Sequence, residues 1–266
     1  MNLCSNKMNP GYLSSSKSKL DKICSFGTLT NMRQKACEWQ LQTHPYPPFI
    51  PEGAEVLLLG SAPPFRFCTQ VKETLKKRDF DYYYGSSSNL FWEILFGVFE
   101  PENLAELDRL RKSESNDRKA REEIIAYLQS FLARYKMALA DILSKFMRCG
   151  ESAADYQLQV LEYQDLVPLI AKHETLKAIC CTSKNRVFYW LWEYLELQEK
   201  TGFVELGQDR EGFYLINREK PFRERFIRVD VLPSPSARGI MRYANKDDFL
   251  RDCRKFYRAI LLPLFS

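Results

Sequence analysis

The sequence predicts an α/β fold in which helices flank a central, mostly parallel sheet and form a three-layer sandwich with it. Residues 56–59 are apolar without polar alternation, which is typical of a strand covered on both faces, and residues 176–181 predict a second strand. Helical patterns separate the strand-like segments, in the order strand, helices, strand, helix, hairpin, strand, helix. The 266 residues, 45% of them hydrophobic, suffice for one large domain with a sizeable core.

The first part of the chain differs in composition from the rest. Residues 1–30 are rich in Ser, Lys and Asn and lack periodicity, so we expect residues 1–40 to form a flexible extension and residues 41–266 to form the folded domain. Four prolines in residues 44–51 predict an extended lead-in to the first strand, expected at residues 55–59. No run approaches the roughly 20 apolar residues of a membrane span, and the N-terminus has no apolar signal-peptide core. We therefore expect a soluble, cytoplasmic protein without membrane contact.

The segment after the first strand predicts mainly helices. Apolar residues at positions 91, 94, 95 and 98 have helical spacing, with Ser88 or Asn89 as the N-cap. Residues 102–112 and 118–135 predict a second and a third helix. The apolar segment 138–146, which contains Asp141, is assigned to neither helix nor strand.

The C-terminal half predicts the remaining strands. The strand at 176–181 ends in a small polar turn and leads to a helix at 187–197. Residues 203–206 and 212–217 predict a hairpin. Residues 226–232 predict a further strand, and residues 247–262 a closing helix.

Cysteine spacing and charge limit the possible partners. The eight cysteines include no CxxC pair and the chain has only two histidines, so we expect reduced thiols, no metal site and no cofactor. The net charge is +5, and residues 218–258 alone hold twelve basic against six acidic residues. This distribution suggests either a polyanionic partner or a solvated basic face.

Two proline-containing loops follow predicted strands. Gly60-Ser61-Ala62-Pro63-Pro64 follows the first strand, and Leu232-Pro233-Ser234-Pro235-Ser236 follows the strand at 226–232. Ligands of open α/β sheets bind outside the carboxyl ends of the strands. Because proline fixes φ, both loops would present backbone groups and Ser hydroxyls with little entropy left to lose. We expect a ligand to bind between them.

Three motifs together resemble the uracil-DNA glycosylase superfamily, closest to its mismatch-specific and hypoxanthine-DNA glycosylase-like branches. They are Gly60-Ser61-Ala62-Pro63, Tyr84-Gly85-Ser86-Ser87-Ser88-Asn89-Leu90-Phe91-Trp92 and Leu232-Pro233-Ser234-Pro235-Ser236. The polar turn 182–184 also falls where the family has one. The resemblance covers residues 45–262.

The resemblance implies a monofunctional, metal-independent enzyme of base excision repair. Such an enzyme flips uracil or hypoxanthine out of DNA and hydrolyses the N-glycosidic bond, here as a monomer that is nucleoid-associated when bound to DNA. Asn89 would be catalytic. The implied base-binding residues are Gly60, Ser61, Ala62, Pro63, Tyr84 as the stacking ring, and Ser183. The implied DNA contacts are Ser234, Ser236, Arg238 and Arg242, in a stretch that would wedge into the duplex.

The chain departs from other branches at two positions. Ala62 stands where an Asn can orient the attacking water, and Leu232 where a His stabilises the departing base. The resemblance therefore assigns the water to Asn89 first and to Asp81 second. Phe91 and Trp92 are expected in the core.

Two acidic residues, Asp141 and Asp155, are expected to cap helices or to pair with Arg148.

A catalytically inactive DNA-binding member of the superfamily is one alternative function. The other is an α/β hydrolase of free nucleosides, which the basic excess disfavours.

Overall fold

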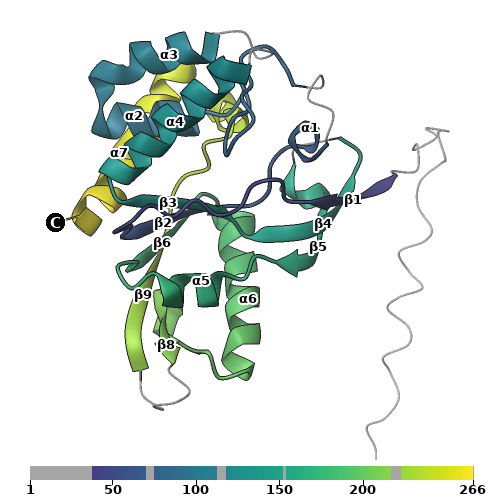
Figure 1. The fold of residues 1–266 in the computed structure, drawn as a ribbon, viewed down its shortest axis with the longest axis vertical. Helices are drawn as coiled ribbons and strands as arrows, with labels where there is room; N and C mark the ends of the chain where they lie inside the picture. The colour runs from purple at the N-terminus through teal and green to yellow at the C-terminus, as the bar shows by residue number, and fades with distance from the viewer. Residues whose placement is uncertain (1–37, 70–74, 113–117, 152–153, 217–222, 266) are drawn as a thin grey trace, which may run out of the picture. The chain divides into compact units, whose positions relative to one another are not determined.

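The computed structural model describes residues 38–69, 75–112, 118–151, 154–216 and 223–265 (Figure 1). Up to residue 37, the expected N-terminal extension lies outside the described residues. Residues 38–266 form one compact unit.

The central sheet has six strands in the order β3-β2-β6-β9-β8-β7. The strands are β2 (Val56–Gly60), β3 (Met137–Asp141), β6 (Ala178–Cys181), β7 (Val204–Leu206), β8 (Gly212–Ile216) and β9 (Arg223–Val231). The first four in the sheet order run parallel, and β8 and β7 are antiparallel additions. Every residue of β2, β3 and β6 is buried, which explains their apolar runs. The predicted mostly parallel sheet is confirmed.

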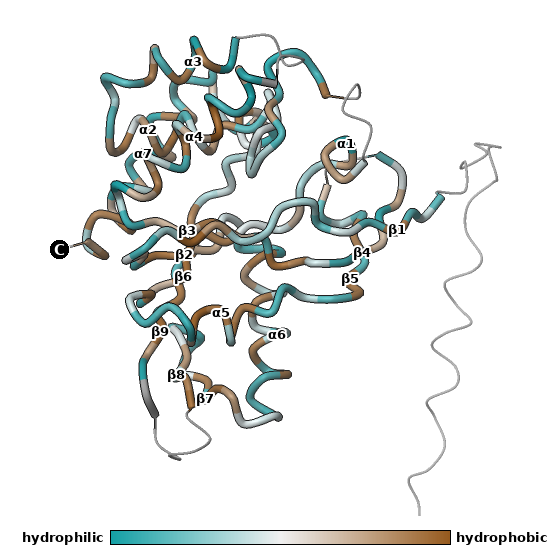
Figure 2. The backbone as a smooth tube through the Cα atoms, in the orientation of Figure 1, coloured by the Kyte–Doolittle hydropathy of each residue, from teal (hydrophilic) through white to brown (hydrophobic). Residues whose placement is uncertain are grey.

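Helices cover both faces of this sheet and complete the predicted three layers (Figure 1). One group contains α2 (Phe91–Phe99), α3 (Leu104–Lys112), α4 (Arg118–Arg134) and α7 (Lys246–Leu261). The other contains α5 (Leu166–Lys172) and α6 (Tyr189–Lys200). Val56 and Leu58 pack into the core beneath the first group, whereas Leu57 and Leu59 pack into the core beneath the second. Figure 2 shows hydrophobic residues concentrated along the central strands between these layers.

A second sheet was not predicted. It is antiparallel and consists of β1 (Trp39–Thr43), β4 (Leu143–Cys149) and β5 (Leu158–Tyr163), in the order β1-β4-β5. Segment 138–146, which sequence analysis left unassigned, therefore supplies most of β3 and the start of β4. Strand pairing across about a hundred residues leaves no local periodic signal, because it depends on the partner strand.

Most other elements match their predictions. The helices α3, α4, α6 and α7, the β7–β8 hairpin and β9 overlap the predicted ranges. Helix α2 begins two residues after Asn89, and both Phe91 and Trp92 are fully buried. No helix in the described ranges combines the length and apolarity needed to cross a membrane.

Among the described cysteines, one differs from the expected reduced thiol. Cys68, Cys180, Cys181 and Cys253 are free thiols, whereas Cys149 is disulfide-bonded. Cysteine spacing alone does not reveal this bond. Within the described part of the chain, no group of three His, Cys, Asp or Glu residues could hold a metal ion.

Candidate functional site

A cavity of about 410 Å³ opens at the edge where the parallel strands end. The loops after β2, β6 and β9 and the segment before α2 all contribute to its wall. Of the predicted site residues, those lining it are Ser61, Ala62, Pro63, Tyr84, Asn89, Ser183, Ser234, Ser236, Arg238 and Arg242. The structure therefore brings together ten residues that come from four separate segments. Their roles remain predictions.

Gly60, the eleventh predicted residue, is not among the lining residues but adjoins two of them. A Cβ atom here would overlap Asp141 Oδ1 and lie 2.5 Å from the Tyr84 hydroxyl oxygen. Glycine at the end of β2 is thus what allows both side chains to approach the strand end.

Tyr84 presents an aromatic ring to the cavity. Its ring stacks on Phe91 with 3.9 Å between centroids, and its hydroxyl lies 3.0 Å from Thr182 Oγ1. Burial raises the pKa of this hydroxyl, and the charge of Asp141 raises it further, so the phenol stays neutral. The backbone of Tyr84 is left-handed, with φ of 53°, a conformation that costs energy in a bulky residue and is concentrated at functional sites.

A buried polar network holds the loop that carries Tyr84. Asp79 accepts hydrogen bonds from Arg66 Nε at 2.6 Å and from the backbone N–H groups of Ser87 at 2.6 Å and Lys76 at 2.9 Å. Arg66 also donates to Ser86 Oγ at 2.8 Å. Sequence reasoning missed this network, because Asp79 lies in a polar, Lys-rich segment without a recognisable motif.

The Asp79 network should make the protein sensitive to acid. Burial alone would raise the pKa of Asp79, but the hydrogen bonds from Arg66, Ser87 and Lys76 lower it below its ordinary value. Its contribution to stability is thus present above about pH 4 and is lost as the pH falls further. We expect Asp79→Asn to have a lower melting temperature than wild type at pH 7. The difference between the two melting temperatures should become smaller towards pH 3. Asp209→Asn, at an exposed position, is the control. A melting-temperature difference between Asp79→Asn and wild type that does not change with pH would contradict the role assigned to the Asp79 carboxylate.

In the side-chain amide of Asn89, the oxygen makes a hydrogen bond to the backbone and the nitrogen has no partner among the described residues. Its Oδ1 accepts the backbone N–H of Phe91 at 2.9 Å at the start of α2, while the described residues offer no partner to Nδ2. Its backbone forms a β-bridge with Ser236, and Leu90 N–H donates to the Pro235 carbonyl oxygen at 3.0 Å. The loop after β9 is thereby attached to the segment before α2, with the Asn89 amide between them.

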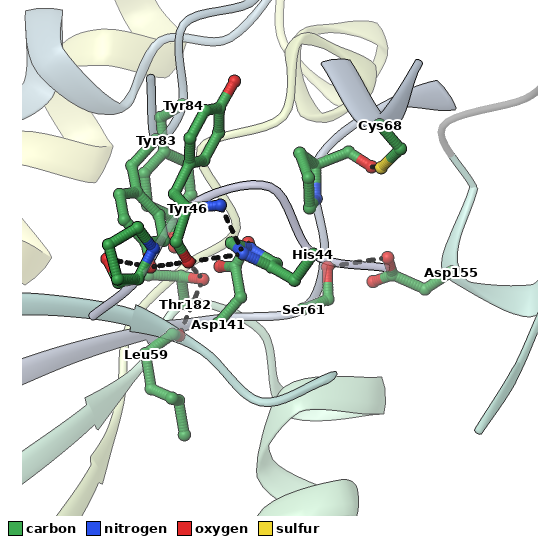
Figure 3. Close-up of polar contacts among 12 residues, drawn as sticks. His44, Tyr46, Leu59, Ser61, Cys68, Tyr83, Tyr84, Asp141, Asp155 and Thr182 are labelled. Atoms are coloured by element: carbon green, nitrogen blue, oxygen red, sulfur yellow. Dashed lines mark hydrogen bonds and ion pairs between the residues drawn. The ribbon is translucent and has the colours of Figure 1, made fainter. Parts of the chain in front are cut away.

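Two aspartates in the cavity have partners other than the expected Arg148 (Figure 3). Asp141 Oδ2 lies 2.8 Å from His44 Nε2, and Asp155 Oδ1 accepts from Ser61 Oγ at 2.9 Å. Burial raises the pKa of Asp155, and the nearby charge of Asp141 adds to the shift. Sequence analysis assigned neither aspartate to the site; a charged residue inside the apolar segment 138–146 is the signal that could have identified Asp141.

The other positions considered for orienting the attacking water offer no polar side chain to the cavity. Asp81, the second candidate, accepts from the Tyr46 hydroxyl at 2.7 Å and is not part of this cavity wall. Leu232 is 1% exposed, and its N–H donates to the Cys181 carbonyl oxygen. Ala62 contributes only a methyl group. Asn89 is therefore the predicted water-positioning residue that the structure leaves in the cavity.

Several of the described basic residues near the C-terminus pair with carboxylates of the fold. Lys246 pairs with Glu93, Arg251 with Asp248, and Arg228 with Asp230. Arg238 and Arg242 instead line the cavity and are exposed, and no carboxylate in the described residues pairs with either. Between them, Met241 is 84% exposed.

Comparisons with known proteins reveal a likeness to a solved structure. No protein-family model matches the chain, and no curated protein matches its sequence. The chain is similar to the solution NMR structure of a "putative Uracil DNA glycosylase" from Methanosarcina acetivorans, at 19% sequence identity and a TM-score of 0.48. The match covers 85% of this chain and 100% of the other.

Proposed function

We propose that this protein is a DNA glycosylase that flips a deaminated base, uracil or hypoxanthine, out of DNA and hydrolyses its N-glycosidic bond. The observation that carries the proposal is the cavity itself. It combines the Tyr84 ring, the Asn89 amide and the exposed Arg238 and Arg242, which pair with no described carboxylate, at the edge of a parallel sheet. An aromatic face, convergent polar groups and nearby cations are what a flipped nucleotide requires.

The base would stack on Tyr84. A flipped base loses its stacking neighbours in the duplex, and an aromatic side chain can replace them. Phe91 supports the Tyr84 ring from one side at 3.9 Å. The cavity volume of about 410 Å³ lies within the range of about 300–1,000 Å³ typical of small-ligand sites.

Asn89 would hold the attacking water. Cleavage builds positive charge on the sugar and negative charge on the departing base, so the water needs an oriented partner more than a strong base. Asn89 lines the cavity, its Oδ1 is oriented by Phe91 N–H, and none of the described residues partners its Nδ2. The proposed step involves no metal and no cofactor.

The loop after β9 would grip the DNA. Ser234 and Ser236 offer hydroxyl groups, and Arg238 and Arg242 offer guanidinium groups, to the phosphates flanking the flipped nucleotide. Exposed Met241 is placed to enter the gap left in the base stack, as apolar wedges do in other DNA-bending proteins.

The decisive experiment is a base-release assay on oligonucleotides that carry uracil or hypoxanthine, as single strands and in each mismatch. We expect abasic product from wild type and a loss of about 100-fold or more in Asn89→Ala, the scale expected when one oriented catalytic partner is removed. Asn89→Ser retains an acceptor for Phe91 N–H but lacks the amide, so it should be equally impaired.

Asn245→Ala is the matched control for the structural role of Asn89. Asn245 Oδ1 caps α7 by accepting Asp248 N–H at 2.9 Å, so this variant loses an Asn cap without losing an amide from the cavity. It should keep activity. DNA binding without release of any base would instead support the inactive DNA-binding alternative, and turnover of free nucleosides alone would support the nucleoside hydrolase.

A further inference from the structure

Of the two carboxylate oxygens of Asp141, only Oδ2 has a hydrogen-bonding partner among the described residues. The residue is only 7% exposed, and its Oδ2 lies 2.8 Å from His44 Nε2. No group in the described ranges donates a hydrogen bond to Oδ1, although the side chain lines the cavity. This oxygen is open to the cavity, so a ligand can supply the donor that the described residues do not.

Asp141 Oδ1 lies at the hydroxyl end of the Tyr84 ring. Asp141 pairs with Gly60 in the register of β3 and β2. Oδ1 and the Tyr84 hydroxyl both occupy the space that a Cβ of Gly60 would fill. A base lying on the Tyr84 ring would therefore direct its polar edge towards Asp141.

The other polar groups beside Asp141 are already committed. Thr182 Oγ1 donates to the Leu59 carbonyl oxygen at 3.1 Å, so the Tyr84 hydroxyl donates to Thr182 across their 3.0 Å contact. The proton of each hydroxyl is thus used within the protein. This end of the cavity accepts hydrogen bonds, and a complementary ligand must donate one.

His44 holds Asp141 in this orientation. The imidazole is 5% exposed, and its Nδ1 lies 3.2 Å from the backbone nitrogen and 2.8 Å from the carbonyl oxygen of Tyr46. Its ring also packs against Tyr83 at 5.5 Å. Because the ring is held on both sides, its Nε2 is fixed 2.8 Å from Asp141 Oδ2 (Figure 3). In the tautomer that carries the hydrogen on Nε2, His44 donates to this oxygen while Nδ1 accepts Tyr46 N–H.

We propose that Asp141 is the specificity-determining acceptor for a ring N–H of the flipped base, and that His44 is the positioning residue that aims it. The inference rests on the proposed function and narrows its substrate class. Uracil and hypoxanthine carry a ring N–H on their polar edge, whereas N-methylated bases do not. A base without this donor leaves Oδ1 buried and unpaired.

The test compares 1-methyluracil with 1,3-dimethyluracil and 9-methylhypoxanthine with 1,9-dimethylhypoxanthine in calorimetry, since a methyl group on the glycosidic nitrogen removes the other ring N–H. Within oligonucleotides, the release assay compares uracil with 3-methyluracil and hypoxanthine with 1-methylhypoxanthine. We expect wild type to prefer each N–H base by about 10- to 100-fold, as for a hydrogen bond to a charged group. Asp141→Ala should reduce this preference to within a few-fold. Melting curves of each variant verify folding.

Variants of His44 test the positioning role. His44→Ala should weaken the preference through KM with little change in kcat, and His44→Gln, which keeps one donor, should restore part of it. His173→Ala is the matched control, because His173 is the other histidine of the chain and lies outside the cavity wall. A preference unaffected in His44→Ala would overturn the positioning role.

The outcomes separate this inference from the proposed function. Equal release of uracil and 3-methyluracil by wild type would overturn the inference while the glycosylase proposal stands. Selective binding of N–H bases without release from any oligonucleotide would support the inference and contradict the glycosylase proposal. Absence of base binding, or equal affinity for bases with and without this ring N–H, would overturn the inference.

Discussion

Gly60→Ala is expected to lower base release by about 100-fold, because misplacing reacting groups by about 1 Å costs that much. The added Cβ would overlap Asp141 Oδ1 and meet the Tyr84 hydroxyl. Both side chains are held from behind, Asp141 by His44 and Tyr84 by Phe91, so neither can retreat without breaking a contact. The same overlap should destabilise the fold by about 1–3 kcal/mol, as overpacking does elsewhere. Steady-state release rates and urea denaturation measure the two effects.

A double variant shows whether the overlap is the cause. Asp141→Ala removes the atom nearest to the new Cβ, so Gly60→Ala/Asp141→Ala should recover stability relative to Gly60→Ala. The stability changes of the two substitutions should therefore be strongly non-additive, as contacting residues are. Additive stability losses, or wild-type activity in Gly60→Ala, would show that the close approach at this strand end does not matter.

Arg148→Met is expected to destabilise the protein by about 2–4 kcal/mol, because it leaves two buried acceptors without donors. Arg148 is 1% exposed, donates from Nε to Gln42 Oε1 at 2.7 Å and from Nη2 to the Pro63 carbonyl oxygen at 2.6 Å. It thus joins the second sheet to the loop that lines the cavity after β2. Methionine keeps most of the apolar stem, so the loss would report the hydrogen bonds rather than a cavity.

A surface residue of the same strand provides the control for Arg148. Lys145, also in β4, pairs with Glu162 at 3.2 Å on the surface, and Lys145→Met should change stability by less than about 1 kcal/mol. Chemical denaturation monitored by tryptophan fluorescence compares the two variants. Equal losses in Arg148→Met and Lys145→Met would contradict a role for the buried guanidinium.

Features that depend on local pattern were readable from the sequence. The unalternated run 56–59 predicted a doubly covered strand, and the prolines after it and after residue 232 predicted two stiff loops at one sheet edge. Helical spacing from Phe91 onwards placed Asn89 beside that edge. The cavity wall follows from these elements, because parallel strands end on the same side of a sheet. Periodicity and proline chemistry act within a few residues, so they leave a signal in the sequence.

The remaining features depend on partners that are distant in the chain. His44 meets Asp141 across 97 positions, and Arg148 reaches Gln42 across 106. The β1-β4-β5 sheet likewise forms from segments on either side of β2 and β3. A hydrogen bond between such residues requires only that the fold bring them together, so no spacing or periodicity in the sequence records it. The approach of Asp141 and Tyr84 to Gly60, on which the proposed base recognition rests, arises from this tertiary packing alone.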